Sequence, residues 1–150
     1  MKKEFGLRSD GQMAYKYTIR GGKITAEISD HGATLLSLLV PDSKGVVADV
    51  VLGFDTPDEY TASGTFFGAT VGRNSNRVGN AQFELGGAIY KLDANDNGMN
   101  NLHSGFDPFK NRMWKVVCHD ESSITLQLES PNGDQGFPGK AVIRVTYTLD

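Results

Sequence analysis

Apolar and polar residues alternate over several short segments of the chain. Between residues 15 and 19, and again between residues 24 and 28, the apolar positions are two apart, which is the pattern of a half-buried antiparallel strand. No window of a dozen residues has the period of a helix. Seven more strand-like runs, mostly bounded by Gly, Pro, Asn or Asp, are residues 34–40, 46–52, 81–85, 88–92, 113–119, 123–129 and 141–149.

This pattern predicts an all-β fold of about nine strands. Pairs of glycines stand between strand-like runs at Gly21-Gly22 and at Gly86-Gly87. Glycine adopts the positive φ that a tight hairpin turn needs, so both pairs are expected to close hairpins.

Two long stretches lack the strand pattern. Residues 93–112 are rich in Asn, Asp and Gly and contain a histidine, while residues 55–71 contain the pair Phe66-Phe67. The second stretch is expected to be a connection that packs its aromatic side chains beneath itself. Long loops in a small domain often carry function, so the functional residues are expected near these two stretches.

Composition supports a soluble globular domain, since 39% of the 150 residues are hydrophobic and 22% are charged. The net charge of -3 is made of scattered charges of both signs, which argues against nucleic acid or a membrane surface as a partner. No apolar run resembles a signal peptide or a membrane span. Cys118 is the only cysteine, so no internal disulfide can form. A cytoplasmic protein that takes a small ligand is expected.

The segment from Gly72 to Arg77 is the strongest binding candidate. It reads Gly-Arg-Asn-Ser-Asn-Arg and places two guanidinium groups and two amides just before a strand pair. These donors suit a hydroxylated or anionic ligand. The alternative is that the arginines pair with surface carboxylates and that the asparagines form turns. Neither of the nucleotide-binding motifs G-x-G-x-x-G and G-x-x-x-x-G-K-S/T occurs in the sequence.

His103 lies among amides, a hydroxyl and a glycine, with Leu102 and Phe106 as neighbouring apolar anchors. It suits either donation to a ligand oxygen or exchange of a proton near neutral pH. An exposed loop histidine is the alternative. His31 and His119 are interpreted as structural, and the spacing of the three histidines does not suit a zinc site.

Two other patterns are interpreted as turns. Asp93, Asn95, Asn97 and Gly98 match the start of a calcium-binding EF-hand loop, but Ser104 stands where a bidentate Glu is needed. No metal is therefore expected. The segment 130–139 contains Asp134, which has no partner acid or base within the segment and is interpreted as part of a shaped loop.

Several of these segments together resemble the aldose 1-epimerase family, also called galactose mutarotases. They are His31-Gly32-Ala33-Thr34-Leu35, Asp49 to Phe54, Gly72-Arg73 with Asn76-Arg77-Val78, Asn101-Leu102-His103, and the turn from Asp134 to Gly139. The resemblance implies a large antiparallel β-sandwich. It also implies an enzyme that interconverts the α and β anomers of a free aldohexose, such as galactose or glucose, without a cofactor.

The resemblance also assigns roles to particular residues. Asn76 and Arg77 would bind sugar hydroxyls, and His103 would bind and orient the sugar near the reacting centre as a catalytic residue. Arg77 and His103 are therefore expected to face one polar cavity. Ser104 departs from the family, which usually has glycine after the motif histidine.

The same resemblance places the general-acid histidine, a sugar-binding aspartate and the general-base glutamate after Asp150. Residues 1–150 would then be the N-terminal part of a single mutarotase-like domain, inactive alone and inclined to associate with the missing part or with another copy. A non-catalytic carbohydrate-binding or interaction module on the same fold is the alternative, as is a hexose-phosphate mutarotase.

Overall fold

Two antiparallel sheets and two short ribbons make up the computed structural model, which describes residues 1–150. The first sheet has the order β1-β2-β3-β4-β5. Its strands are β1 (Lys2–Leu7), β2 (Met13–Gly21), β3 (Ile24–Ser29), β4 (Thr34–Pro41) and β5 (Val47–Asp49). The second sheet joins β10 (Lys115–His119), β11 (Ser123–Ser130) and β12 (Ala141–Thr148) in that order. The predicted all-β, antiparallel class is confirmed.

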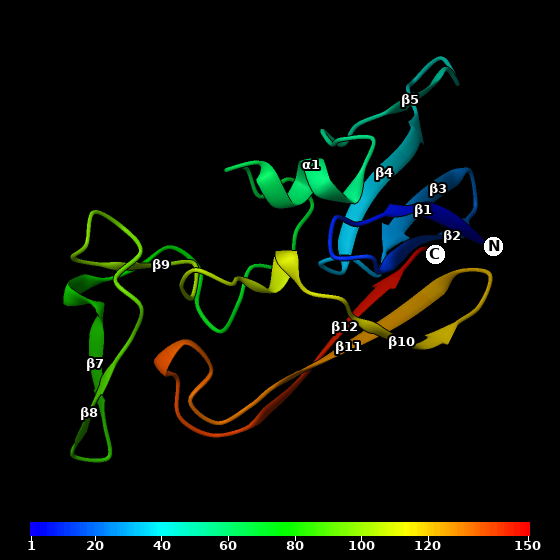
Figure 1. The fold of residues 1–150 in the computed structure, drawn as a ribbon. Helices are drawn as coiled ribbons and strands as arrows, with labels where there is room; N and C mark the ends of the chain where they lie inside the picture. Colours follow the sequence, from blue (N-terminus) through cyan, green and yellow to red (C-terminus); the bar gives the residue numbers. More distant parts are fainter.

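Both ribbons lie to one side of the two sheets, at the left in Figure 1. One pairs β6 (Arg77–Val78) with β9 (Asn101–Leu102), and the other pairs β7 (Gln82–Leu85) with β8 (Ala88–Lys91). The β7–β8 hairpin stands at the end of the molecule away from the first sheet, and the loop between β11 and β12 extends toward it. A small apolar cluster of Ala81, Leu92 and Phe137 joins the hairpin to that loop.

The main core forms where the two sheets face each other. Ile19 and Ile28 from the first sheet and Ile124 and Leu126 from β11 are all 0% exposed and belong to one cluster. Alternate residues of a strand point to one face, so the period-two pattern of the sequence places these side chains inside. Each fully buried aliphatic side chain of this kind contributes about 1.5–3 kcal/mol.

Both glycine hairpins form. Gly86 and Gly87 have φ of +61° and +78° between the paired residues Leu85 and Ala88, as a type I′ turn requires. In the other hairpin Gly21 pairs with Ile24, so the turn is formed by Gly22 and Lys23, one residue later than predicted.

Besides the two-residue strands β6 and β9, which no pattern predicted, β1 and β5 differ from the sequence-based expectation. β1 was not predicted, because it is an edge strand with little burial and so lacks the alternating pattern. β5 ends at Asp49 instead of continuing to residue 52. The Asp49 carboxylate accepts hydrogen bonds from the backbone N–H groups of Leu38 and Val51, and one backbone bond, from the Val50 N–H to the Leu38 carbonyl, continues the pairing.

The structure has little helix, as predicted, and its one α-helix lies in a stretch that the strand pattern left unassigned. Helix α1 (Pro57–Ala62) starts at Thr56, whose hydroxyl accepts from the Glu59 backbone while the Glu59 carboxylate accepts from the Thr56 backbone. The Lys110 ammonium donates to the Tyr60 and Ser63 carbonyls at the other end. Six residues are too few for a helical period, so the capping box is the only local signal for this helix.

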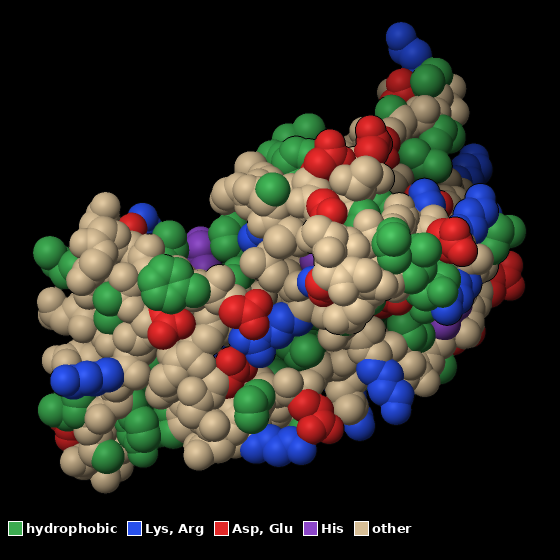
Figure 2. Space-filling view, in the orientation of Figure 1, with side chains coloured by type: hydrophobic (Ala, Val, Ile, Leu, Met, Phe, Trp, Pro, Cys, Tyr) green, Lys and Arg blue, Asp and Glu red, His purple; other side chains and the backbone are tan.

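The helix belongs to the stretch predicted to pack its own aromatics, and it does so. Phe54 stacks on Phe67 and meets Tyr60 edge to face, with ring centroids 5.8 and 5.2 Å apart. No helix in the structure has the length and apolar character needed to cross a membrane. Figure 2 shows acidic and basic side chains interspersed over the face in view, with no field of one sign.

Candidate sugar-binding site

The β6–β9 ribbon brings the candidate residues from two loops together. Arg77 pairs with Leu102, and immediately outside this pair the His103 backbone donates to the Asn76 carbonyl at 3.0 Å. The Asn76 backbone N–H in turn donates to the His103 Nδ1 at 3.0 Å. Asn76, Arg77 and His103 therefore form one cluster, as expected.

This contact sets the chemical state of the His103 ring. Because Nδ1 accepts a hydrogen bond, the neutral ring carries its proton on Nε2. Burial, and secondly the charge of Arg77, lower the pKa of His103 below its ordinary value. A neutral Nε2–H donor fits this geometry better than a group that exchanges its proton near neutral pH.

The Arg77 side chain forms an ion pair with Asp96, a partner that sequence reasoning missed. Its Nε donates to the Asp96 carboxylate at 2.8 Å, and its Nη1 donates to the Asn76 side-chain oxygen at 3.2 Å. The Arg77 side chain is 53% exposed, so it still presents donors to solvent. The hydrogen bond from Arg77, followed by that from Asn100, lowers the pKa of Asp96. Within an Asn-rich turn nothing marked Asp96 as the partner of Arg77.

Arg73 belongs to the same segment as Asn76 and Arg77, but its side chain contacts the loop that follows β11. Its guanidinium donates five hydrogen bonds into the loop that follows β11, to the Ser130 hydroxyl and to the carbonyls of Ser130, Pro131, Pro138 and Gly139, at 2.8 to 3.0 Å. Of the five N–H groups of a guanidinium, the one on Nε, one on Nη1 and both on Nη2 are used here, with Nη2 shared among three carbonyls, so one N–H of Nη1 is left without a partner. Most of the Arg73 guanidinium therefore fixes the 130–139 loop, and little of it is left to bind a ligand.

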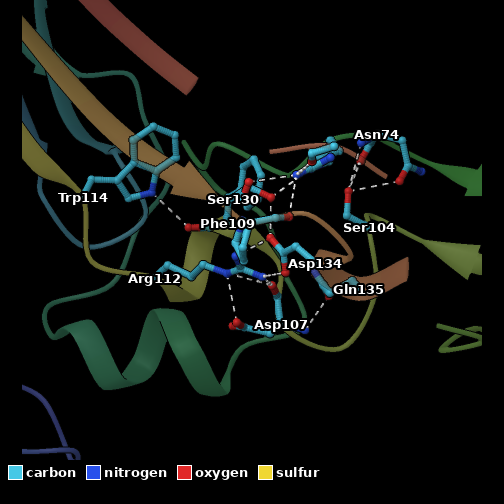
Figure 3. Close-up of polar contacts among 12 residues, drawn as sticks. Asn74, Ser104, Asp107, Phe109, Arg112, Trp114, Ser130, Asp134 and Gln135 are labelled. Atoms are coloured by element: carbon cyan, nitrogen blue, oxygen red, sulfur yellow. Dashed lines mark hydrogen bonds and ion pairs between the residues drawn. The ribbon is translucent and has the colours of Figure 1, made fainter. Parts of the chain in front are cut away.

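The 130–139 loop is further held by Asp134. Figure 3 shows Arg112 forming a two-pronged ion pair with Asp134, at 2.7 and 2.8 Å, and a second contact with Asp107. The hydrogen bonds from Arg112 lower the pKa of Asp134, with Ser130 adding to the effect. Asp134 is a structural carboxylate, as the sequence indicated.

The calcium-like segment is also used for turn structure. Asn95 accepts from the Leu102 backbone at 2.7 Å and donates to the carbonyls of Leu102 and Gly105. Asp93 accepts from the Phe106 backbone. These asparagine and aspartate side chains shape the loop that presents His103.

His31 and His119 lie away from this cluster. His31 is 0% exposed and its ring contacts Arg8 and Thr61, while the His119 ring meets the Thr18 carbonyl at 3.1 Å. Both have the structural roles that the sequence indicated.

Arg77 and His103 were predicted to face one polar cavity. The two residues lie together, joined through Asn76, but neither lines the cavity found in this structure. The one cavity in the structure, of about 350 Å³, lies over the first sheet and is lined by Glu4, Phe5, Lys16, Glu27, Leu36, Ser37, Asp49, Phe54 and Asp55.

Comparison with known proteins decides the family. The family model described as aldose 1-epimerase matches residues 15–150. The chain belongs to the aldose 1-epimerase family. Among its relatives, aldose 1-epimerase of Escherichia coli is 36% identical over 95% of this chain and 41% of its own length. Galactose mutarotase of Sus scrofa is 39% identical over 96% of this chain and 42% of its own length.

Solved structures of aldose 1-epimerase relatives share the fold. A crystal structure of an aldose epimerase homologue from C. elegans has a TM-score of 0.83 at 38% identity, covering 91% of this chain and 42% of that one. Galactose 1-epimerase from Lactobacillus acidophilus has a TM-score of 0.81 at 26% identity, covering 100% of this chain and 44% of that one. The chain therefore spans about two fifths of the length of the relatives it matches.

Proposed function

We propose that this chain supplies the sugar-binding part of an aldose 1-epimerase site, as the N-terminal part of one mutarotase-like domain. The observation that supports the proposal most directly is the cluster of Asn76, Arg77 and His103 on the β6–β9 ribbon. Amide, guanidinium and imidazole N–H donors on one open surface suit an aldohexose, whose hydroxyls and ring oxygen accept hydrogen bonds. The relatives named above are aldose 1-epimerases and galactose mutarotases.

The proposed reaction needs a base and an acid. The base removes the proton from the C1 hydroxyl, the acid protonates the ring oxygen, and the bond between C1 and the ring oxygen breaks to give the open aldehyde. Rotation about the C1–C2 bond and reclosure invert the anomer and return both protons. In this scheme His103 donates its Nε2–H to a sugar oxygen, while Asn76 and Arg77 bind hydroxyls.

The carboxylates near the cluster are poor candidates for the base. Asp96 and Asp134 are each paired with an arginine, and that pairing lowers the pKa of both. A carboxylate stabilised in its charged form has little tendency to take up a proton. We therefore propose that the acid and the base lie outside these 150 residues, and that the isolated chain binds without catalysing.

Among the alternative functions, the structure weakens the hexose-phosphate reading. Arg73 and Arg77 were the only candidates for a phosphate, and four of the five N–H groups of Arg73 are engaged by the 130–139 loop. A single exposed arginine remains, so a free sugar is preferred. The non-catalytic sugar-binding module is the second candidate, because the chain has binding groups and no acid–base pair.

Polarimetry separates the two candidates. The protein as its gene encodes it is mixed with freshly dissolved α-galactose and with α-glucose, and the approach to anomeric equilibrium is followed. An epimerase accelerates this approach and loses the acceleration in Arg77→Ala and His103→Ala variants. Sugar binding by calorimetry without any acceleration identifies the binding module. We expect the cytoplasm as its location, where the exposed thiol of Cys118 stays reduced.

A further inference from the structure

Ser104 has a backbone conformation that is unusual for serine. Its φ is +74°, and it stands between His103 at +53° and Gly105 at +123°. This left-handed region favours glycine, and other residues keep it only where surrounding contacts enforce it. The Ser104 side chain is also 0% exposed. The contacts of this buried serine, directly beside His103, must therefore stabilise its unusual conformation.

Those contacts all lead to one residue of the opposite loop. The Ser104 hydroxyl accepts from the Asn74 backbone N–H at 2.9 Å. It also lies 3.1 Å from the Asn74 carbonyl and 3.0 Å from the Asn74 side-chain oxygen, to one of which it donates its proton (Figure 3). Gly72 leaves the space for this hydroxyl, because a Cβ there would collide with it. The buried Ser104 hydroxyl thus holds the turn of residues 72–76 through Asn74.

The same turn reaches His103 two residues later. The Asn76 N–H meets the His103 Nδ1, and the Asn76 carbonyl accepts from the His103 backbone. Ser104 therefore holds one end of a short segment whose other end determines which ring nitrogen of His103 carries the proton. If the segment moved, the Asn76 N–H would leave Nδ1 and the proton could occupy either nitrogen.

We propose that Ser104 is a positioning residue, whose hydroxyl holds Asn74 so that Asn76 keeps the His103 ring in its Nε2–H form, facing the sugar. The kinetic part of this proposal rests on the proposed function. The structural part stands on the hydrogen bonds alone. Ser104 does not touch the sugar and acts only through Asn74, Asn76 and His103.

Two substitutions separate positioning from stability. Ser104→Ala removes the hydroxyl and keeps the strain of a side chain at positive φ. Ser104→Gly removes the hydroxyl and relieves that strain, so it regains part of the lost stability. Ser29→Ala is the matched control, because Ser29 is also 0% exposed and its hydroxyl also joins a backbone donor, His31, to a backbone acceptor, Tyr15.

The measurements use the protein as its gene encodes it. Nitrogen-15 NMR of the imidazole ring reports the tautomer of His103, thermal unfolding reports stability, and polarimetry with α-galactose gives kcat/KM. We expect a single Nε2–H form in the parent protein and in Ser29→Ala. Both Ser104 variants should show a mixture of tautomers and a fall in kcat/KM of about ten- to a hundredfold, since small displacements of a positioned group have effects of this size.

The outcomes are distinct. If Ser104→Gly keeps the single tautomer and the parental rate while only the melting temperature of Ser104→Ala falls, Ser104 stabilises the fold and the proposal is wrong. Should Ser104→Ala fail to fold, Ser104→Gly decides by the same criteria. If the Ser104 variants change the tautomer but even the parent protein shows no mutarotation, the positioning role holds and the proposed function fails.

Discussion

The His103 imidazole lies against the phenyl ring of Phe66, with the two ring centroids 4.4 Å apart. Phe66 belongs to the connection after helix α1, and the Lys110 ammonium that binds the end of this helix also stands 5.2 Å from the Phe66 ring. The face of His103 is therefore covered by an apolar wall, while Nδ1 is occupied by Asn76. Nε2 has no hydrogen-bond partner in the structure, so it is the ring nitrogen left to meet a ligand.

His103 is expected to act as a donor rather than as a proton shuttle. His103→Ala should lower kcat/KM for mutarotation by about 10²–10³, the range for the loss of one preorganised hydrogen-bond donor. His103→Gln keeps an N–H donor near the place of Nε2 but cannot titrate in this range, and it should retain activity within about tenfold of the parent. Polarimetry over pH 5–9 makes the comparison. A Gln variant as slow as the Ala variant would show that His103 transfers a proton.

Asp96 is expected to influence binding through Arg77. Asp96→Asn removes the charge that fixes the Arg77 side chain, so KM for the sugar should rise by about five- to tenfold with a smaller change in kcat. The matched control is Glu129→Gln, which removes an exposed ion pair with Lys140 in which Asn76, Arg77 and His103 take no part. An equal rise in KM in both variants would contradict a specific role for Asp96.

Arg73 should contribute stability. Arg73→Ala leaves the carbonyls of the 130–139 loop without a charged donor, and we expect a loss of about 2–4 kcal/mol in the free energy of unfolding. Arg144→Ala, which removes one exposed contact with Gln127, should change the free energy by less than about 0.5 kcal/mol. Urea denaturation measures both. If Arg73 instead bound the ligand, its loss would raise KM and leave the denaturation midpoint unchanged.

His31 makes stability depend on pH. Burial, followed by the charge of Arg8, lowers its pKa to about 4, whereas the unfolded chain protonates near 6.5. The unfolded state therefore binds more protons between these values, so stability is fully present above pH 6.5 and falls as the pH drops toward 4. The loss from this group amounts to roughly 3 kcal/mol. Thermal unfolding of the parent and of His31→Gln over pH 4–8 checks it, since the variant should lack this part of the slope.

The isolated chain of 150 residues is expected to be catalytically silent and to associate. The β12 strand pairs with β11 on one side only, and an unpaired edge offers its backbone groups to another strand. Light scattering and polarimetry on one sample test both parts. A monodisperse monomer that accelerates mutarotation would contradict this prediction.

Sequence reasoning found the strands whose burial alternates, because that pattern is local. It placed β2, β3, β11 and β12 with small errors at their ends. It missed β1 and α1, whose sequences do not record burial in a regular period. The capping residues Thr56 and Glu59 were the signal available for the helix.

In the candidate site, too, local motifs were readable from the sequence and long-range contacts were not. Asn76, Arg77 and His103 could be named from motifs, but the register that joins Asn76 to His103 across 27 residues has no local signature. The same holds for Arg73, which looked like a ligand-binding group and is mostly engaged by the 130–139 loop. Long-range partners such as Asp96 for Arg77 become visible only in three dimensions.

The hydrogen bonds of Arg73 also bear on the order of folding. They join residues 57 or more positions apart, so the loop between β11 and β12 cannot anchor the 72–77 segment until that long stretch of chain has been enclosed. Contacts of such sequence separation form late, because the entropy of closing the loop must be overcome first. The first sheet, whose strands follow one another through short connections, can form during synthesis well before the proposed sugar-binding surface exists. A nascent chain would thus carry a stable sheet and an unassembled site, and ligand could assist only the last stage of folding.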